Sequence, residues 1–151
     1  MFTEPKSPKI IFLSDDDTDD CSLFKEALHE VQSEANLTIV SDGVRLMQAL
    51  ADSEPEKPEV IFLDLNMPRK NGFECLEEIR KSPKFMDIPV VIFSTSTNAD
   101  VVDRTFNQGA NLYITKPASY SSLKKTLAFV FSIGEQLRER PAREKFVVRV
   151  A

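Results

Sequence analysis

Five short runs of large apolar residues recur along the chain and most constrain its fold. They lie at residues 10–13, 37–40, 60–63, 89–93 and 111–115. Their length and their content of β-branched and aromatic residues are typical of strands in parallel sheets, most of them buried on both faces. Between and after them, apolar residues recur at helical spacing around 19–31, 46–51 and 73–79, and over 98–108 and 119–137. Five strands alternating with five helices predict a doubly wound α/β domain with a parallel sheet.

The length of 151 residues fits one such domain, which we expect over 9–137, with a lead-in at 1–8 and an extension at 138–151. The net charge of −5 argues against direct binding of DNA. The sequence has no apolar run long enough to span a membrane and no signal peptide, and two cysteines make no disulfide framework. We therefore expect a cytoplasmic protein that is not attached to a membrane.

The extension leaves two interpretations open. It is locally basic, and Phe146, Val148 and Val150 alternate as in a half-buried strand. It is either a disordered tail or an arm that adds to a sheet edge or packs on a partner chain.

Chemically useful side chains follow the predicted strands. They are Asp15 and Asp16 after the first, Asp64 after the third, Ser94 at the end of the fourth and Lys116 after the fifth. In a sheet of order 2-1-3-4-5 the first and third strands are neighbours, so the three carboxylates would share one cleft. Two such charges about 4 Å apart repel by about 4 kcal/mol at an effective dielectric of 20. An oxygen-only site of this kind favours Mg²⁺, or Mn²⁺, as the balancing cation.

A lysine and a hydroxyl across the cleft are the groups that stabilise a phosphoryl group during transfer. An aspartate can itself accept that group. Asp64 is the candidate acceptor. The other interpretation is that Asp64 only begins a turn.

With these residues in place, the chain resembles the receiver domains of two-component response regulators, from about residue 9 to 137. The matching motifs are the acidic pair Asp15 and Asp16, Asp64 before Leu65-Asn66-Met67-Pro68, Gly72, Ser94, and Lys116 before Pro117. The resemblance implies a flavodoxin-like fold of order 2-1-3-4-5.

The resemblance also implies roles for these residues. Asp16, Asp64 and the backbone carbonyl of Asn66 would bind the metal ion, with Asp15 acting through water. Lys116 and Ser94 would contact the phosphoryl oxygens. Tyr113 stands where the family often carries an aromatic switch residue, although an ordinary half-buried strand aromatic is the alternative. Thr95 departs from the small residue usual in the family, and its bulk would narrow access to the acyl phosphate.

The function implied is that of a stand-alone receiver. It would accept a phosphoryl group from a histidine kinase or a phosphotransfer protein on Asp64, with Mg²⁺. It would then switch a surface formed by the fourth helix, fifth strand and fifth helix for an unknown downstream protein. Self-catalysed phosphorylation and slow dephosphorylation would be its only chemistry, and we expect a monomer or a weak homodimer.

Three alternatives remain. One is an adaptor on the same fold that does not depend on phosphorylation. Another is a haloacid-dehalogenase-like phosphatase, which would need threonine or valine at Asp19. The third, a calcium-binding loop, would need glycine at Asp20. We expect Asp17, Asp19 and Asp20 to form a solvated helix start, with Thr18 or Asp19 as the N-cap residue.

Overall fold

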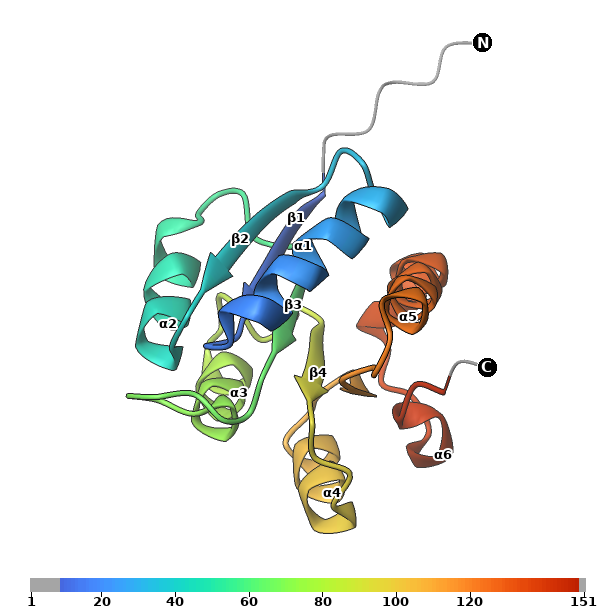
Figure 1. The fold of residues 1–151 in the computed structure, drawn as a ribbon. Coiled ribbons are helices and arrows are strands. Elements are labelled where there is room, and N and C mark those ends of the chain that lie inside the picture. Colours follow the sequence, from blue (N-terminus) through green and yellow to red (C-terminus); the bar gives the residue numbers. More distant parts are fainter. Residues whose placement is uncertain (1–8, 150–151) are drawn as a thin grey trace, which may run out of the picture.

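The computed structural model describes residues 9–149, and its centre is one parallel sheet (Figure 1). The strands are β1 (Ile10–Ser14), β2 (Asn36–Val40), β3 (Val60–Leu63), β4 (Val90–Ser94) and β5 (Leu112–Thr115). Their order is β2-β1-β3-β4-β5, and all four pairings are parallel. The predicted doubly wound α/β fold and strand order are confirmed.

Helices cover both faces of the sheet (Figure 1). They are α1 (Thr18–Val31), α2 (Gly43–Asp52), α3 (Gly72–Lys81), α4 (Ala99–Asn107) and α5 (Tyr120–Ile133). Residues of α1 and α5 pack in one core layer, and residues of α2, α3 and α4 pack in the other. No helix within residues 9–149 is long and apolar enough to cross a membrane.

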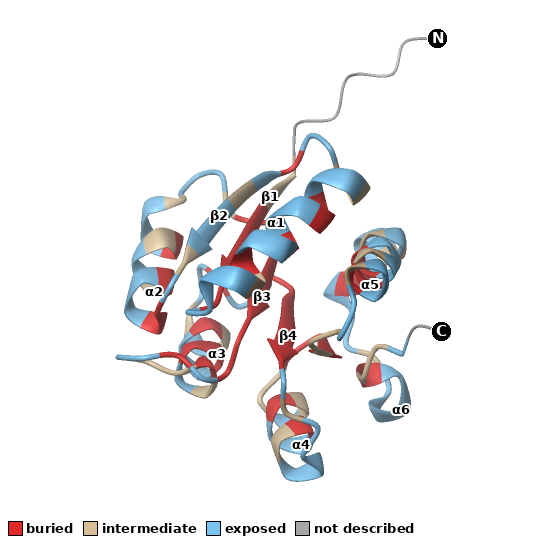
Figure 2. Cartoon of the chain, in the orientation of Figure 1, coloured by how far each residue is buried: buried red, intermediate tan, exposed pale blue. Residues whose placement is uncertain are grey.

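Burial along the strands follows their place in the sheet (Figure 2). Every residue of β3 and β4 is buried, as expected for central strands with helices on both faces. The edge strand β2 is mostly exposed, and Ile39 is 40% accessible. The central strands therefore form the rigid support from which the polar strand-end residues extend.

Local sequence explains where several helices begin and end. Asp17, rather than the expected Thr18 or Asp19, is the N-cap residue of α1, because its side chain accepts the N–H groups of Asp19 and Asp20. Asn71 forms a capping box at the start of α3. Gly109 follows α4 with a φ of +97°, and its N–H donates to the carbonyl oxygen of Phe106, which is typical of a glycine that ends a helix.

The last long helix is shorter than predicted. Its α-helical part ends at Ile133, and the chain continues as the 3₁₀-helix η1 (Gly134–Arg138). Gly134 has a φ of +61°, which breaks the α-helical hydrogen-bond pattern before the expected end near Leu137. The apolar spacing continues through this change because Leu137 is still buried.

The segment after η1, residues 139–149, folds back onto the domain, and we call it the C-terminal arm. It contains a one-turn helix, α6 (Arg143–Phe146), so the domain has one more short helix than the five predicted. Phe146 is fully buried against Phe106 and Tyr113, with ring centroids 5.1 and 6.1 Å away. The backbone N–H of Val148 donates to the carbonyl oxygen of Tyr113 at 2.9 Å, beside the free edge of β5.

The described part of this extension thus lies beside the edge strand β5. Its assignment as a tail or as an arm stays a prediction. The arm packs on its own chain. It makes one bridge to β5 rather than the predicted alternating strand, because Phe146 ends a helical turn. Val150 and the lead-in at residues 1–8 lie outside the described residues.

Candidate functional site

The sheet register brings the acidic residues together at the carboxyl ends of the central strands. Ser14 and Leu63, the last residues of β1 and β3, are partners in the ladder. Asp15 and Asp64 therefore leave neighbouring strands at the same level, and the Asp64 N–H donates to Ser14. One carboxylate oxygen from each of Asp15, Asp16 and Asp64 lies within 4.8 Å of the others.

Lys116 extends into this cluster from the end of β5. Its backbone N–H donates to Ser94, which fixes the start of the side chain beside β4. Its Nζ lies 2.8 Å from Asp15 Oδ2 and 3.2 Å from Asp64 Oδ2. The side chain is only 10% exposed, so these charges interact with little screening by water.

The charges shift the titration of both partners. Burial by itself would lower the pKa of Lys116, but hydrogen bonds to carboxylates and the charge of Asp64 outweigh it and raise that pKa above its ordinary value. Burial raises the pKa of Asp15 to about 6, and the charge of Asp64 adds to this rise. The Lys116 ammonium group and the Asp17 N–H oppose it.

The donor set fits a hard divalent cation. Asp15 Oδ2 is buried and accepts no hydrogen bond from residues 9–149, although the lysine nitrogen is 2.8 Å away. Lys116 supplies one positive charge against the three carboxylates of Asp15, Asp16 and Asp64, so a second cation would balance the remaining negative charge. Only carboxylate oxygens form the cluster, which favours Mg²⁺ or Mn²⁺ over zinc.

Asp64 is held by its own loop. Its Oδ1 accepts the N–H of Leu65 at 2.7 Å, which fixes the carboxylate, and the residue is 6% exposed. Gly72 packs directly behind it: a Cβ built on Gly72 would lie 2.3 Å from the carbonyl oxygen of Asp64. Only glycine allows this approach, so Gly72 sets the position of the loop that follows β3.

The other predicted site residues lie around this centre with different exposure. Ser94, the last residue of β4, is buried, and its hydroxyl accepts the N–H of Ser96 at 3.2 Å. Thr95 and Asn66 are both exposed at the surface of their loops. No contact of the Asn66 carbonyl with the cluster is seen, so its role as a ligand stays a prediction.

Tyr113 lies beneath the C-terminal arm rather than in the acidic cluster. It is fully buried, not half-buried as the alternative interpretation expected. Its hydroxyl donates to the carbonyl oxygen of Ser96 at 2.7 Å. It thereby connects β5 to the loop that begins at Ser94.

One carboxylate partner of Lys116 was not predicted from the sequence. Asp20 was expected to be part of a solvated helix start, but its Oδ2 lies 2.8 Å from Lys116 Nζ. A signal for this was present. Asp20 lies four residues before Phe24 and seven before Ala27, so helical spacing places it on the stripe that faces the sheet. Leu23, an apolar residue of the same helix, is instead 46% exposed.

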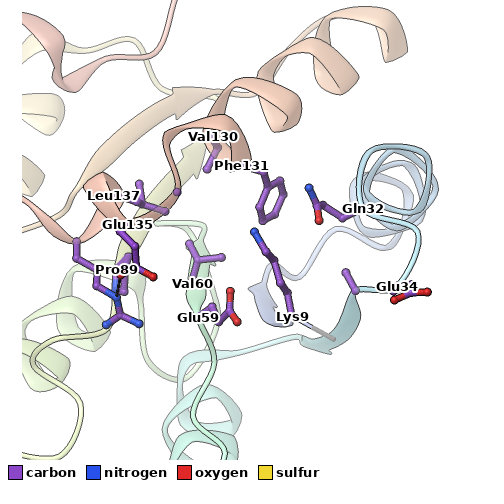
Figure 3. A pocket seen from close by; sticks show the side chains of 13 residues that line it. Lys9, Gln32, Glu34, Glu59, Val60, Pro89, Val130, Phe131, Glu135 and Leu137 are labelled. Carbon is purple, nitrogen blue, oxygen red and sulfur yellow. Dashed lines mark ion pairs between the residues drawn. The ribbon is translucent and has the colours of Figure 1, made fainter. Parts of the chain in front are cut away.

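A hollow of about 600 Å³ lies at the other end of the sheet (Figure 3). Lys9, Val60 and Pro89, which line it, stand at the amino ends of β1, β3 and β4. The Lys9 ammonium group lies 5.3 Å from the centre of the Phe131 ring. This hollow is therefore separate from the acidic cluster, which lies at the carboxyl ends.

Comparison with known proteins identifies the family. Residues 11–128 match the family described as the response regulator receiver domain. The chain belongs to this family. Receivers are proteins of two-component signalling, so the haloacid-dehalogenase and calcium-loop alternatives do not hold for this domain.

Individual receivers are similar over nearly the whole chain. Response regulator Rcp1 of Synechocystis sp. is 34% identical over 146 residues, which cover 94% of this chain and 99% of Rcp1. The structure of the Mn²⁺-bound form of Rcp1 gives a TM-score of 0.74 at 34% identity and covers 89% of this chain and 100% of that one. The structure of the phosphorylated cyanobacterial phytochrome response regulator RcpA gives 0.77 at 35% identity, with coverages of 83% and 93%.

Proposed function

We propose that this protein is a stand-alone receiver in the cytoplasm that accepts a phosphoryl group on Asp64 from a histidine kinase or a phosphotransfer protein. The observation that carries the proposal is the ion pairing of Lys116 Nζ, from the end of β5, with both Asp15 and Asp64, from the ends of β1 and β3. A fixed cation facing a carboxylate nucleophile is what phosphoryl transfer requires.

In the proposed reaction an oxygen of Asp64 attacks the phosphorus of the donor. A new O–P bond forms while the N–P bond to the donor histidine breaks, and the bonding electron pair leaves with the imidazole nitrogen, which then takes a proton. Lys116 and the Ser94 hydroxyl contact the phosphoryl oxygens. Asp64 needs no general base because it reacts as the carboxylate.

A divalent cation would be held by Asp15, Asp16, Asp64 and the carbonyl of Asn66, with Asp15 acting through water. When bound, Mg²⁺ or Mn²⁺ would neutralise charge on the phosphoryl oxygens. The donor set supports this, as does the Mn²⁺ in the similar protein Rcp1. Thr95, beside Ser94, would narrow the path of water to the acyl phosphate and set its lifetime.

The phosphorylated state would change a surface made by α4, β5 and α5. Tyr113 supports this as the connecting residue, because its hydroxyl bonds the loop that begins at Ser94. The downstream partner would be a protein rather than DNA or a membrane, and the receiver would act as a monomer or a weak homodimer. The domain limits proposed are 9–137, with the lead-in at 1–8 and the extension at 138–151.

Intact-protein mass spectrometry after incubation with acetyl phosphate tests the proposal. We expect wild type to gain one phosphoryl group only with Mg²⁺, and Asp64→Asn to gain none while it keeps its far-ultraviolet circular dichroism. Asp52→Asn is the matched control, since it removes an exposed carboxylate at the end of α2 and should label normally. Metal-dependent labelling that persists in Asp64→Asn would contradict the assignment. No labelling of wild type would favour the adaptor alternative.

A further inference from the structure

Lys116 has a third carboxylate partner that belongs to neither the acidic pair nor the acceptor position. Asp20 Oδ2 lies 2.8 Å from Lys116 Nζ and forms both a hydrogen bond and an ion pair with it. The corresponding distance to Asp64 Oδ2 is 3.2 Å. In this structure the ammonium group is thus nearer to Asp20 than to the proposed acceptor.

The fold fixes Asp20 in this place. The Asp17 side chain caps α1 and accepts the N–H of Asp20 at 3.0 Å, so the backbone at this point is held. Helical spacing turns the side chain toward the sheet, on the stripe of Phe24 and Ala27. Asp19, one residue earlier, is exposed, and its carboxylate makes no ion pair with any residue of 9–149.

Asp20 stands outside the group that could hold a metal ion. That group comprises Asp15, Asp16 and Asp64. A cation bound there would attract the carboxylates of Asp15 and Asp64 and would so weaken their ion pairs with Lys116. Asp20 would keep its full charge and its contact with the ammonium group.

An ammonium group has three N–H donors, and here it faces three carboxylates. Within residues 9–149 its two hydrogen bonds go to Asp20 and Asp64. A phosphoryl group on Asp64 would take the place of the Asp64 carboxylate, so Asp20 is the hydrogen-bonded partner that would compete with it for the ammonium group. We propose that Asp20 is a positioning residue that competes with the phosphoryl group for Lys116 and thereby slows phosphorylation of Asp64 and weakens the phosphorylated state. This inference rests on the proposed function and adds to it a restraint on Lys116.

The test compares Asp20→Asn with Asp19→Asn at saturating Mg²⁺ and constant ionic strength. Both variants remove one negative charge from the first turn of α1, but only the first removes the partner of Lys116. Two readouts serve: the rate of labelling by acetyl phosphate, and the affinity for beryllofluoride, which mimics the acyl phosphate, by fluorine NMR. Because Asp20 is partly exposed, we expect both to rise about two- to fivefold in Asp20→Asn and to stay near wild type in Asp19→Asn.

A second pair of measurements separates competition from a general effect of charge. Beryllofluoride affinity is measured again in a Lys116→Ala background, where Asp20→Asn should have no further effect. The ammonium signal of Lys116 in nitrogen-15 NMR should be protected from exchange in wild type and Asp19→Asn, and less protected in Asp20→Asn, where only Asp15 and Asp64 remain as partners.

Equal behaviour of the two aspartate variants, slower labelling of Asp20→Asn, or a gain that persists without Lys116 would overturn the inference. Failure of the proposed function looks different. In that case wild type and both variants alike would neither label nor bind beryllofluoride.

Discussion

The Lys116 ammonium group and the Asp15 carboxylate form a buried ion pair, and the Asp64 carboxylate lies 3.2 Å from the same ammonium group. Burial raises the pKa of Asp15 to about 6. Asp15 is therefore largely protonated at pH 5 and ionised at pH 7.5. A metal ion needs the ionised form, so binding must release the remaining proton.

Mg²⁺ affinity should consequently depend on pH in this range. For a group with a pKa of about 6, the affinity at pH 5 should be about tenfold weaker than at pH 7.5, because protonation competes with the metal. Isothermal titration calorimetry at the two pH values measures the ratio. Asp15→Asn should bind Mg²⁺ more weakly at pH 7.5 and show a smaller ratio. An unchanged ratio would assign the pH dependence to another group.

Gly72 offers a test of how the acceptor is positioned. In Gly72→Ala the new Cβ would meet the backbone of Asp64 and Leu65 at 2.3 and 2.8 Å, so the loop after β3 must move. We expect a loss of about 1–3 kcal/mol in the free energy of unfolding and a weaker Mg²⁺ affinity.

Urea unfolding and calorimetry measure the two effects. Gly134→Ala is the control: its Cβ would meet nothing within 4 Å, although its φ of +61° still disfavours alanine. It should lower stability without changing Mg²⁺ affinity. Normal metal binding by Gly72→Ala would show that this contact does not position the carboxylate.

Part of the site could be predicted from the sequence for a simple physical reason. Asp15, Asp64 and Lys116 follow buried strands, and parallel strands bring their carboxyl ends to one edge of the sheet. Asp20 could not be found in this way because it sits on a helix, where only the phase of the turn decides which side chain points inward. The helix dipole by itself accounts for an aspartate in the first turn of a helix, so no contact with a distant residue such as Lys116 was expected for Asp20.

Among the secondary-structure elements, the C-terminal arm is the least predictable from sequence and the most informative. Its only fully buried large side chain is Phe146, which packs between α4 and β5. Arg143 adds an ion pair from the arm to Asp103 of α4. Basic composition suggested a solvated tail, because one buried aromatic ring in a charged segment produces no periodic signal. The end of α5 was mispredicted for a similar reason, since the apolar residue Leu137 continues the helical spacing beyond Gly134.

Removal of the Phe146 ring should release the C-terminal arm from the domain. Phe146→Ala is expected to cost about 3 kcal/mol or somewhat less, because the arm can detach before the core unfolds. Hydrogen exchange should show the Val148 N–H losing the protection it gains from its bond to Tyr113.

Phe129→Ala makes the same change at a side chain on α5 that is 44% exposed, and it should have a small effect on both measurements. If Val148 stays protected in Phe146→Ala, the backbone bridge rather than the aromatic contact holds the arm.

At the scale of the whole molecule, the acidic cluster and the hollow near Lys9 lie apart along the direction of the strands. The acidic cluster occupies the carboxyl ends of the strands, whereas the hollow near Lys9 occupies the amino ends (Figure 3). The general architecture was predictable because apolar runs and helical spacing alternate without interruption along residues 10–133. The polar residues at the strand ends then determine which function the fold can carry out.

Tyr113 has a practical consequence for anyone who handles this protein. Its hydroxyl bonds the loop beginning at Ser94, while its main-chain carbonyl bonds Val148, three positions before the last residue of the sequence. An affinity tag or fluorescent fusion joined after Ala151 would therefore be attached close to Val148, and it could disturb Tyr113 and, through it, the loop that follows β4. The chain enters β1 at the amino end of the sheet, whereas the acidic cluster lies at the carboxyl ends of the strands. For kinetic work the tag should therefore be joined before Met1.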